Sequence, residues 1–327
     1  MRVVSLLPSA TEIVYALGLG DQLAGVTFEC DEPASARRDK TVVVGGRDTS
    51  GMSPAAIDAY VRAELAAGRD LYTLHADALA ALDPELILTQ DLCRVCALPA
   101  GHVEDALDYL GCTAAVVSLD PRTLDDVLTT ILTIGKHTGA QQQAGHLVAS
   151  LRRRLAAVAD RVAGRYRPAV AVIEWVDPPF SAGHWVPDLV TAAGGRPVAA
   201  CPGGLSVQTG WEQIAAASPE VAVVAPCGFH LDGAAVQAGL AARQLPGTRC
   251  GRSTPTGSSC VPGRAWSTAS RRSRPSCTPA RRPHPLAASA ASPDRLIRLA
   301  GGDATTVGSM CRGVREVGVM PTRPSPL

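Results

Sequence analysis

Residues 141–165 read QQQAGHLVASLRRRLAAVADRVAGR and decide the fold. Their apolar side chains recur at steps of three and four residues, a spacing that predicts one apolar stripe along a helix. The stripe consists of Leu147, Leu151, Leu155, Val158 and Val162. At a rise of about 1.5 Å per residue, such a helix is roughly 35 Å long. Segments of α/β character lie on both sides of it and resemble each other, so the helix is predicted to be a rigid spine between two lobes.

The bulk composition agrees with two lobes of ordinary size. A chain of 327 residues can bury two separate cores. No apolar run approaches the ~18–20 residues that a membrane span needs. Pro8 follows the first apolar run so closely that no signal-peptide core fits before it. We therefore expect a cytoplasmic protein whose 10 cysteines stay reduced. The alternative is a start further upstream and a location outside the cytoplasm.

The first lobe opens with a strand, a loop and a helix. Residues 2–7 predict a strand, and Ser9 or Thr11 can cap a helix over 12–17. The loop between them lies at the carboxyl end of a strand, where open α/β sheets bind ligands. No glycine-rich phosphate-binding motif is present, so nucleotide binding has no support. Further strands are expected at 25–27, 42–44, 84–89 and 114–119, and further helices at 71–82 and 103–110.

The second lobe repeats this pattern. A strand is expected over 169–173, a long loop over 174–185 and a helix over 186–193. Residues 82–88, LDPELIL, match residues 217–223, ASPEVAV, at an offset of 135. In the same register, Asp77 and Glu212 each begin the helix that feeds the repeated strand. Either the two carboxylates complement helix dipoles, or they form a matched pair displayed for a partner.

Several motifs together resemble a known family. Residues 5–12, SLLPSATE, residues 177–183, DPPFSAG, and the helical spine are similar to the cobalamin-binding proteins of ABC importers, of the helical-backbone class that also serves ferric siderophores and haem. The resemblance covers roughly residues 1–247. Residues 90–97, QDLCRVCA, with Glu174, Trp175 and residues 183–185, look like a leaderless Cys-x-x-Cys branch of that family.

The resemblance implies an α/β fold with two Rossmann-like lobes joined by one long backbone helix. The expected parts are an N-terminal lobe at 1–121, a helical spine at 122–165, a shortened C-terminal lobe at 166–249 and a tail at 250–327. It also implies that one ligand binds between the lobes, and that Asp77 and Glu212 pair with arginines of a permease. We expect a monomer that catalyses nothing and has no catalytic residues.

A corrin is a broad, mostly apolar disc with amide arms, so its site needs aromatic faces and a few hydrogen-bonding groups. Cobalamin, a corrinoid, is therefore the expected bound ligand. The expected ligand-binding residues are Pro8, Ser9, Phe28, Glu29, Cys30, Gln90, Cys93, Cys96, Trp175, Phe180, His184 and Trp185. Glu29 and Gln90 stand where the family's importer protein has aromatic side chains, so the corrinoid need not be the same.

More than one role is open for Cys93, Cys96 and His184. The two cysteines can hold a soft metal, form a redox dithiol or pack as small hydrophobic side chains. His184 is the candidate metal residue, as a ligand of cobalt, or it is a loop histidine bonded to the backbone. The first alternative function is a ferric-siderophore or haem carrier, and the second is a cytosolic thiol enzyme that uses Cys93 and Cys96.

The tail differs from the rest of the chain. From Cys250 onward it has 3 acidic and 12 basic residues, against 27 and 19 before it. With GC-rich codons, the neighbouring frame over 253–278 can be written as a strand, a turn and an amphipathic helix. We interpret the tail as a shifted reading frame that is disordered. Its arginines are therefore not interpreted as a nucleic-acid site.

Overall fold

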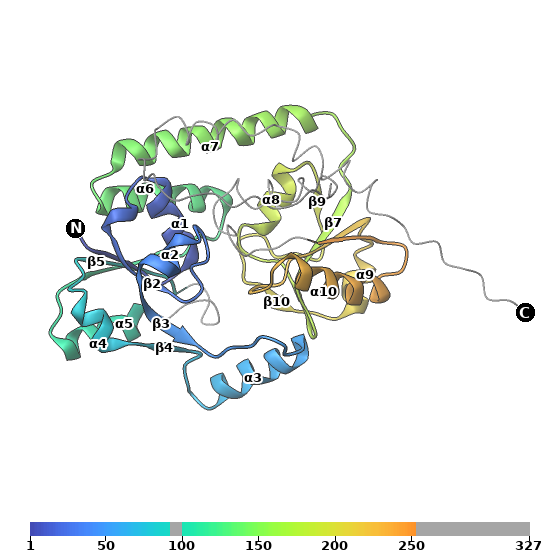
Figure 1. Ribbon diagram of the computed structural model, residues 1–327. Helices are drawn as coiled ribbons and strands as arrows, with labels where there is room; N and C mark the ends of the chain where they lie inside the picture. The colour runs from blue at the N-terminus through green and yellow to red at the C-terminus, as the bar shows by residue number, and fades with distance from the viewer. Residues whose placement is uncertain (92–99, 253–327) are drawn as a thin grey trace, which may run out of the picture. The chain divides into compact units, whose positions relative to one another are not determined.

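The computed structural model describes residues 1–91 and 100–252 (Figure 1). All of these residues belong to one compact unit of the chain. Within it, two separate six-stranded sheets carry helices. This arrangement confirms the predicted α/β class with two Rossmann-like halves and a long connecting helix. The predicted tail and its reading-frame interpretation fall, from residue 253 onward, outside the described residues.

The first sheet has the strand order β4-β3-β2-β1-β5-β6 and is parallel except for β4. Its central strands are short and β-branched, and Val3 and Val4 are fully buried, as in sheets covered on both faces. The strands are β1 (Val3–Ser5), β2 (Leu23–Thr27), β3 (Thr41–Gly46), β4 (Tyr72–Leu74), β5 (Leu86–Thr89) and β6 (Ala115–Ser118). The loops after β1, β2, β5 and β6 therefore meet at one edge.

The helices between these strands differ in how deeply they are buried. α1 starts with Pro8 in its first turn and buries Ile13 and Val14 in the core. α3 begins after Ser53, whose side chain caps it, and has no buried residue. The set comprises α1 (Pro8–Ala16), the 3-10 helix η1 (Gly20–Gln22), α2 (Ser35–Asp39), α3 (Pro54–Ala66), α4 (Ala76–Ala81) and α5 (Ala100–Leu110).

The second sheet is mixed. β7, β9, β11 and β12 run parallel, whereas β8 returns antiparallel to β7 and pairs with β10. The strands are β7 (Ala169–Val176), β8 (Pro179–Ser181), β9 (Arg196–Pro197), β10 (Val207–Gln208), β11 (Val221–Val224) and β12 (Arg249–Arg252). The helices are α8 (Val186–Ala192), α9 (Trp211–Ala216) and α10 (Leu231–Gln244). β12 extends two residues past residue 250, where the tail was expected to begin.

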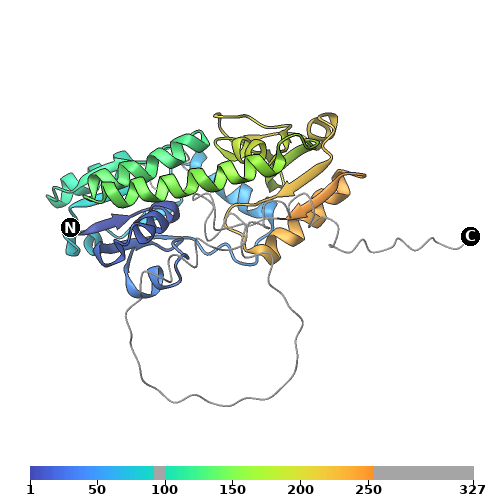
Figure 2. The same ribbon diagram turned by 90° about the horizontal axis from the view of Figure 1, so that it is seen from above.

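Two helices connect the sheets. α6 (Leu124–His137) has a capping box at Thr123 and Asp126, and α7 (Gln141–Val162) is the predicted spine helix. They lie side by side (Figure 2) and bury Ile131 and Ile134 of α6 with Val148 and Leu151 of α7 in the core of the first sheet. α7 also contacts α8 of the second sheet. The apolar period therefore predicted this helix correctly.

Among the described residues, hydrogen bonds that cross between the segments of the two sheets include the following. The Leu124 N–H donates to Asp188 Oδ2 at 2.9 Å. Arg62 of α3 donates to the side-chain oxygen of Gln208 at 2.6 Å. The Trp175 indole N–H donates to the carbonyl oxygen of Pro54 at 3.2 Å.

Some predicted elements were wrong in detail. Residues 71–82 were expected to be one helix, but 72–74 form β4, because this stretch pairs with the open edge of β3. Residues 174–185 were expected to be a loop, but β7 continues to Val176 and turns into β8. Helices α3 and α10 were not predicted. These differences arise from pairings with residues distant in sequence, which a local pattern does not contain.

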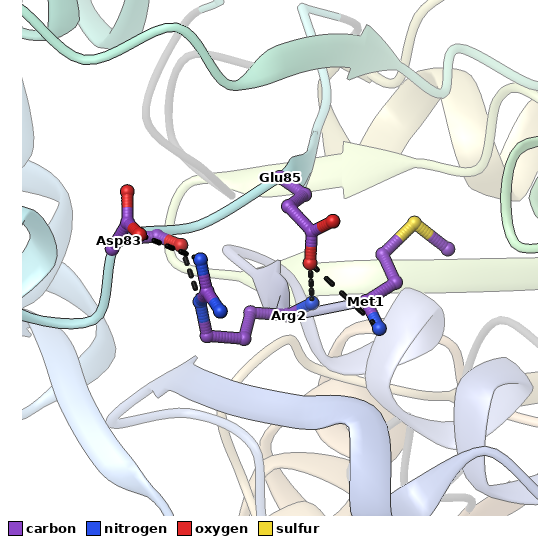
Figure 3. Close-up of polar contacts among 4 residues, drawn as sticks. All are labelled: Met1, Arg2, Asp83 and Glu85. Carbon is purple, nitrogen blue, oxygen red and sulfur yellow. Dashed lines mark hydrogen bonds and ion pairs between the residues drawn. The ribbon is translucent and has the colours of Figure 1, made fainter.

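The sequence repeat is a repeat of structure. Asp83 and Ser218, 135 residues apart, both have a positive φ, of 45° and 50°. The glutamates two positions later, Glu85 and Glu220, each accept a hydrogen bond from a backbone N–H at the start of a neighbouring strand: Arg2 at 2.6 Å and Ala169 at 2.9 Å. In the first sheet, the Arg2 guanidinium also pairs with Asp83 at 2.6 Å (Figure 3).

The packing of α6 makes a direct prediction. Ile131→Ala should lower the free energy of unfolding by about 3 kcal/mol, because the fully buried side chain leaves a cavity in the core. Leu132→Ala is the matched control. Its side chain is 40% exposed, so its loss should cost less than about 0.5 kcal/mol. Urea unfolding of both variants measures the difference, and equal losses would contradict the assigned helix face.

Candidate functional site

One small hollow is lined from both sheets. Ser9 lies in the first turn of α1, where a loop was expected, Gln90 directly follows β5, and Trp185 directly precedes α8 of the second sheet. Side chains nearly fill the hollow, and the space left inside it is about 10 Å³, on the order of one water molecule. Its lining is completed by Ile13, Leu119, Pro121, Val127 and Thr130. The structure thus brings together three of the predicted ligand-binding residues at the expected edge of the sheet, with Pro8 directly before Ser9.

Phe28 and Glu29 lie in the loop after β2. The Phe28 ring lies 6.1 Å from that of Tyr72, and the Tyr72 hydroxyl donates to Glu29 at 3.5 Å. Burial raises the pKa of Glu29 to about 7, although the hydrogen bond from Tyr72 opposes the shift; Asp31 adds to it by charge repulsion. At neutral pH this carboxyl is therefore close to half protonated and can donate or accept a hydrogen bond.

Cys30 lies in the core of the first sheet. Its side chain has no exposed surface, and its sulfur lies 3.0 Å from the Thr11 hydroxyl. Burial raises the pKa of the thiol to about 12, so it is neither a thiolate nor accessible at neutral pH. Contact with a ligand, as predicted, would require this side chain to leave the core.

Trp175 and Phe180 pair across the β7–β8 hairpin. The Trp175 indole N–H is already used, since it donates to the carbonyl oxygens of Pro54 and Asp177 at 3.2 and 3.1 Å. Its ring lies 5.6 Å from that of Phe229. Trp175 therefore joins the two sheets through its polar edge, and only the remainder of its ring is free for a ligand.

His184 has a backbone held by the neighbouring segment. Its N–H donates to the Gly204 oxygen at 2.6 Å, its φ is 50°, and its ring lies 5.8 Å from that of Trp185. Burial lowers the pKa of the imidazole, and the positive charge of Arg122 lowers it further. The neutral form is the one that binds metals. However, Nε2 is buried and has no partner among the described residues, so binding cobalt through it requires the ring to turn.

Glu174 is a site residue whose role was not predicted. The Ser206 hydroxyl and the Gly183 backbone N–H both donate to its carboxylate. Burial nevertheless raises its pKa to about 7. The sequence did carry one sign of this role: Glu174 is a charged residue inside a mostly apolar strand, AVAVIEWV. A carboxylate in such a place must have hydrogen-bond partners. Its partners lie in distant loops, which the sequence did not reveal.

Asp77 and Glu212 occupy equivalent places in the two sheets. Each lies in the first turn of its helix, α4 or α9, and each is exposed. This confirms that both carboxylates begin the helices before the repeated strands. The location suits either the dipole role or the docking role, and both interpretations stay open.

Cys93 and Cys96 lie outside the described residues. In the described part of the chain, no group of three or more histidine, cysteine or acidic side chains is placed to hold a metal ion. No helix there is both long enough and apolar enough to cross a membrane.

The family described as periplasmic binding protein matches residues 3–245. The vitamin B12-binding protein of Yersinia pestis (strain Pestoides F) is 25% identical over 235 residues, 71% of each chain. The periplasmic vitamin B12-binding protein BtuF of Vibrio cholerae has a TM-score of 0.53 at 21% identity, covering 78% of this chain and 88% of its own. The periplasmic haem-binding protein HutB of Vibrio cholerae has a TM-score of 0.57 at 20% identity, covering 78% and 90%. These structures show the fold.

The buried carboxyl of Glu29 predicts a pH dependence. Its pKa is raised in the folded protein, so the folded state holds the proton more tightly. The contribution of this carboxyl to stability is then fully present below pH 4.5 and is lost as the pH rises through about 7. Glu29→Gln should remove this loss and stabilise the protein at pH 8 by up to about 3 kcal/mol.

Glu85→Gln is the control of opposite sign. The backbone N–H of Arg2 lowers the pKa of Glu85, so its contribution is present above pH 4.5 and is lost as the pH falls. Urea unfolding at pH 5 and pH 8 measures both variants. A Glu29→Gln variant no more stable than the wild type at pH 8 would show that this carboxyl is not buried.

Proposed function

This chain belongs to the periplasmic binding protein family, and on that premise we propose that it binds a corrinoid of the cobalamin type between its two sheets. The observation that carries the proposal is the hollow that Ser9 and Gln90 share with Trp185. Residues from both halves of the molecule line it, so a ligand that opens this hollow or covers its mouth contacts both halves. We propose that 1–121 and 166–249 act as the two lobes of this site and that 122–165 acts as the spine.

The chemistry of the hollow suits a corrin. The Trp185 ring offers an apolar face, whereas the Gln90 amide both donates and accepts hydrogen bonds, as the amide arms of a corrin do. Glu29, in the loop after the neighbouring strand β2, is close to half protonated at neutral pH, so it can donate to an amide oxygen or accept from an amide nitrogen. The similarity to a vitamin B12-binding protein over 71% of the chain supports the same ligand class.

Haem is the second candidate. The observation that favours it is the neutral imidazole of His184, since haem iron commonly binds a histidine. Two features weigh against haem. Nε2 is buried in this structure, and haem carries carboxylates that would be repelled by ionised Glu29. Neutral amide arms are not repelled in this way.

We propose binding without turnover, as is typical of this family. The thiol-enzyme alternative depends on Cys93 and Cys96, and the described part of the chain adds nothing in its favour. The proteins of known fold that this chain is similar to are named as periplasmic. We therefore favour delivery of the ligand outside the cytoplasm, with an ABC permease as partner, over handling in the cytoplasm.

The test is a calorimetric titration of the protein with cyanocobalamin, aquocobalamin and haemin. We expect saturable binding of a corrinoid at one site and weaker binding of haemin. Trp185→Leu should weaken corrinoid binding at least about tenfold, because it removes an aromatic face of the site. Trp211→Leu is the control, since Trp211 packs against the core of the second sheet. No corrinoid binding by the wild type would reject the proposal, and tighter binding of haemin would replace it with haem.

Asp77 and Glu212 are proposed as the docking pair for the permease. Exposed charges of this kind steer and orient a partner more than they add affinity. Charge reversal of both, to Arg, should reduce ligand transfer to a permease reconstituted in liposomes and make the residual transfer less sensitive to salt. The affinity for the ligand should not change, because neither side chain lines the hollow. Unchanged transfer would leave only the helix-dipole role.

A further inference from the structure

We propose that Glu174 is a positioning residue of this site: it holds together the two segments, 182–185 and 201–206, that place His184 and Trp185. The inference rests on the proposed function, because it concerns the same site. It goes further by assigning a role to a buried residue that touches neither the hollow nor the proposed ligand.

The carboxylate of Glu174 bridges the two segments. It lies near the end of β7 and accepts one hydrogen bond from the Ser206 hydroxyl and one from the Gly183 backbone N–H. Gly183 comes directly before His184, and Ser206 ends the second segment. One carboxylate thus accepts a hydrogen bond from each of the two segments.

The segments are also joined directly through their backbones. The His184 N–H donates to the Gly204 oxygen at 2.6 Å, and the Gly203 N–H donates to the His184 oxygen at 3.1 Å. These two bonds form a short ladder, although neither segment is a strand. Both the N–H and the carbonyl oxygen of His184 are therefore hydrogen-bonded to the second segment.

Gly183 shows how close this contact is. A Cβ atom at Gly183 would lie 2.4 Å from the carbonyl carbon of Leu205 and from the nitrogen of Ser206, distances that no side chain tolerates. The absence of a side chain at this position lets the two backbones touch. Glu174 then satisfies a donor from each of them at the point of contact.

The chemistry requires an acceptor here and not a negative charge. Burial raises the pKa of Glu174 to about 7 even though two donors oppose the shift, so ionisation gains little at neutral pH. A glutamine can make both contacts: its oxygen accepts from the Gly183 N–H, and its NH₂ donates to the Ser206 oxygen. A leucine leaves both donors buried and unsatisfied.

Glu220 is a matched control in the same sheet. It also accepts one backbone N–H, from Ala169 at 2.9 Å, and one hydroxyl, from Tyr166 at 2.8 Å. Its contacts lie at the opposite end of β7, where the strand begins. Loss of Glu220 therefore affects the same strand and the same kinds of bond without affecting the segments of the site.

The experiment compares Glu174→Leu, Glu174→Gln, Ser206→Ala and Glu220→Leu with the wild type. Amide hydrogen exchange of peptides covering 182–186 and 203–206 reports on the segments and needs no ligand. Calorimetry with cyanocobalamin reports on the site. If Glu174→Leu does not fold, Ser206→Ala removes one of the two donors and keeps the test valid.

We expect Glu174→Leu to speed exchange in both peptides about tenfold or more and to weaken cyanocobalamin binding by a similar factor. Ser206→Ala should do the same to a smaller extent, and Glu174→Gln should restore both readouts. Glu220→Leu should lower the melting temperature and change neither readout. Unchanged exchange in Glu174→Leu and Ser206→Ala, or equal effects in Glu220→Leu, would overturn the proposal.

The two hypotheses fail in different ways. If the wild type does not bind cyanocobalamin but Glu174→Leu still speeds exchange only in these peptides, the corrinoid function is wrong and the holding role of Glu174 is supported. If the wild type binds and Glu174→Leu exchanges normally with unchanged affinity, the function stands and the positioning role is wrong.

Discussion

The contact between α6 and α7 at Gly135 is the constraint on which the rest of the structure depends. A Cβ atom at Gly135 would lie only 2.4 Å from the Cβ of Ala144, so the absence of a side chain allows the two helices to touch. This close approach puts Ile131 and Ile134 of α6 into the same core as Leu151 of α7. Because α7 also contacts α8, the position of the second sheet is tied to the packing of the first.

The site follows from this arrangement and from the direction of the strands. In each sheet, the parallel strands bring their loops to one edge. Ser9 reaches the hollow from the first turn of α1, Gln90 from the end of β5, and Trp185 from the segment before α8 of the second sheet. The carboxyl of Glu29, in the loop after β2, adds a group whose charge is easily lost near neutral pH. The proposal of a ligand that carries amides rests on this combination of one aromatic face with polar groups that both donate and accept.

Much of the architecture could be predicted because its causes are local. The three- and four-residue spacing in 141–165 predicted α7, and the match at an offset of 135 predicted a strand that recurs in both halves after a helix begun by Asp77 or Glu212. The structure adds that Asp83 and Ser218 share a positive φ. The site was less predictable because its causes are nonlocal. The roles of Glu174 and Cys30 depend on which distant groups surround them, namely Ser206 and Thr11. The β7–β8 hairpin and the edge strand β4 depend on pairing partners.

The most direct measurement of the central claim is hydrogen exchange with and without cyanocobalamin. We expect cyanocobalamin to slow amide hydrogen exchange in two separate regions. These are residues 9–13, near the start of α1 beside the first sheet, and residues 184–189, which lead into α8 beside the second. Protection in both regions requires a ligand that contacts both halves of the molecule. Protection confined to one region, or none at a saturating concentration of ligand, would contradict a site shared between the two sheets.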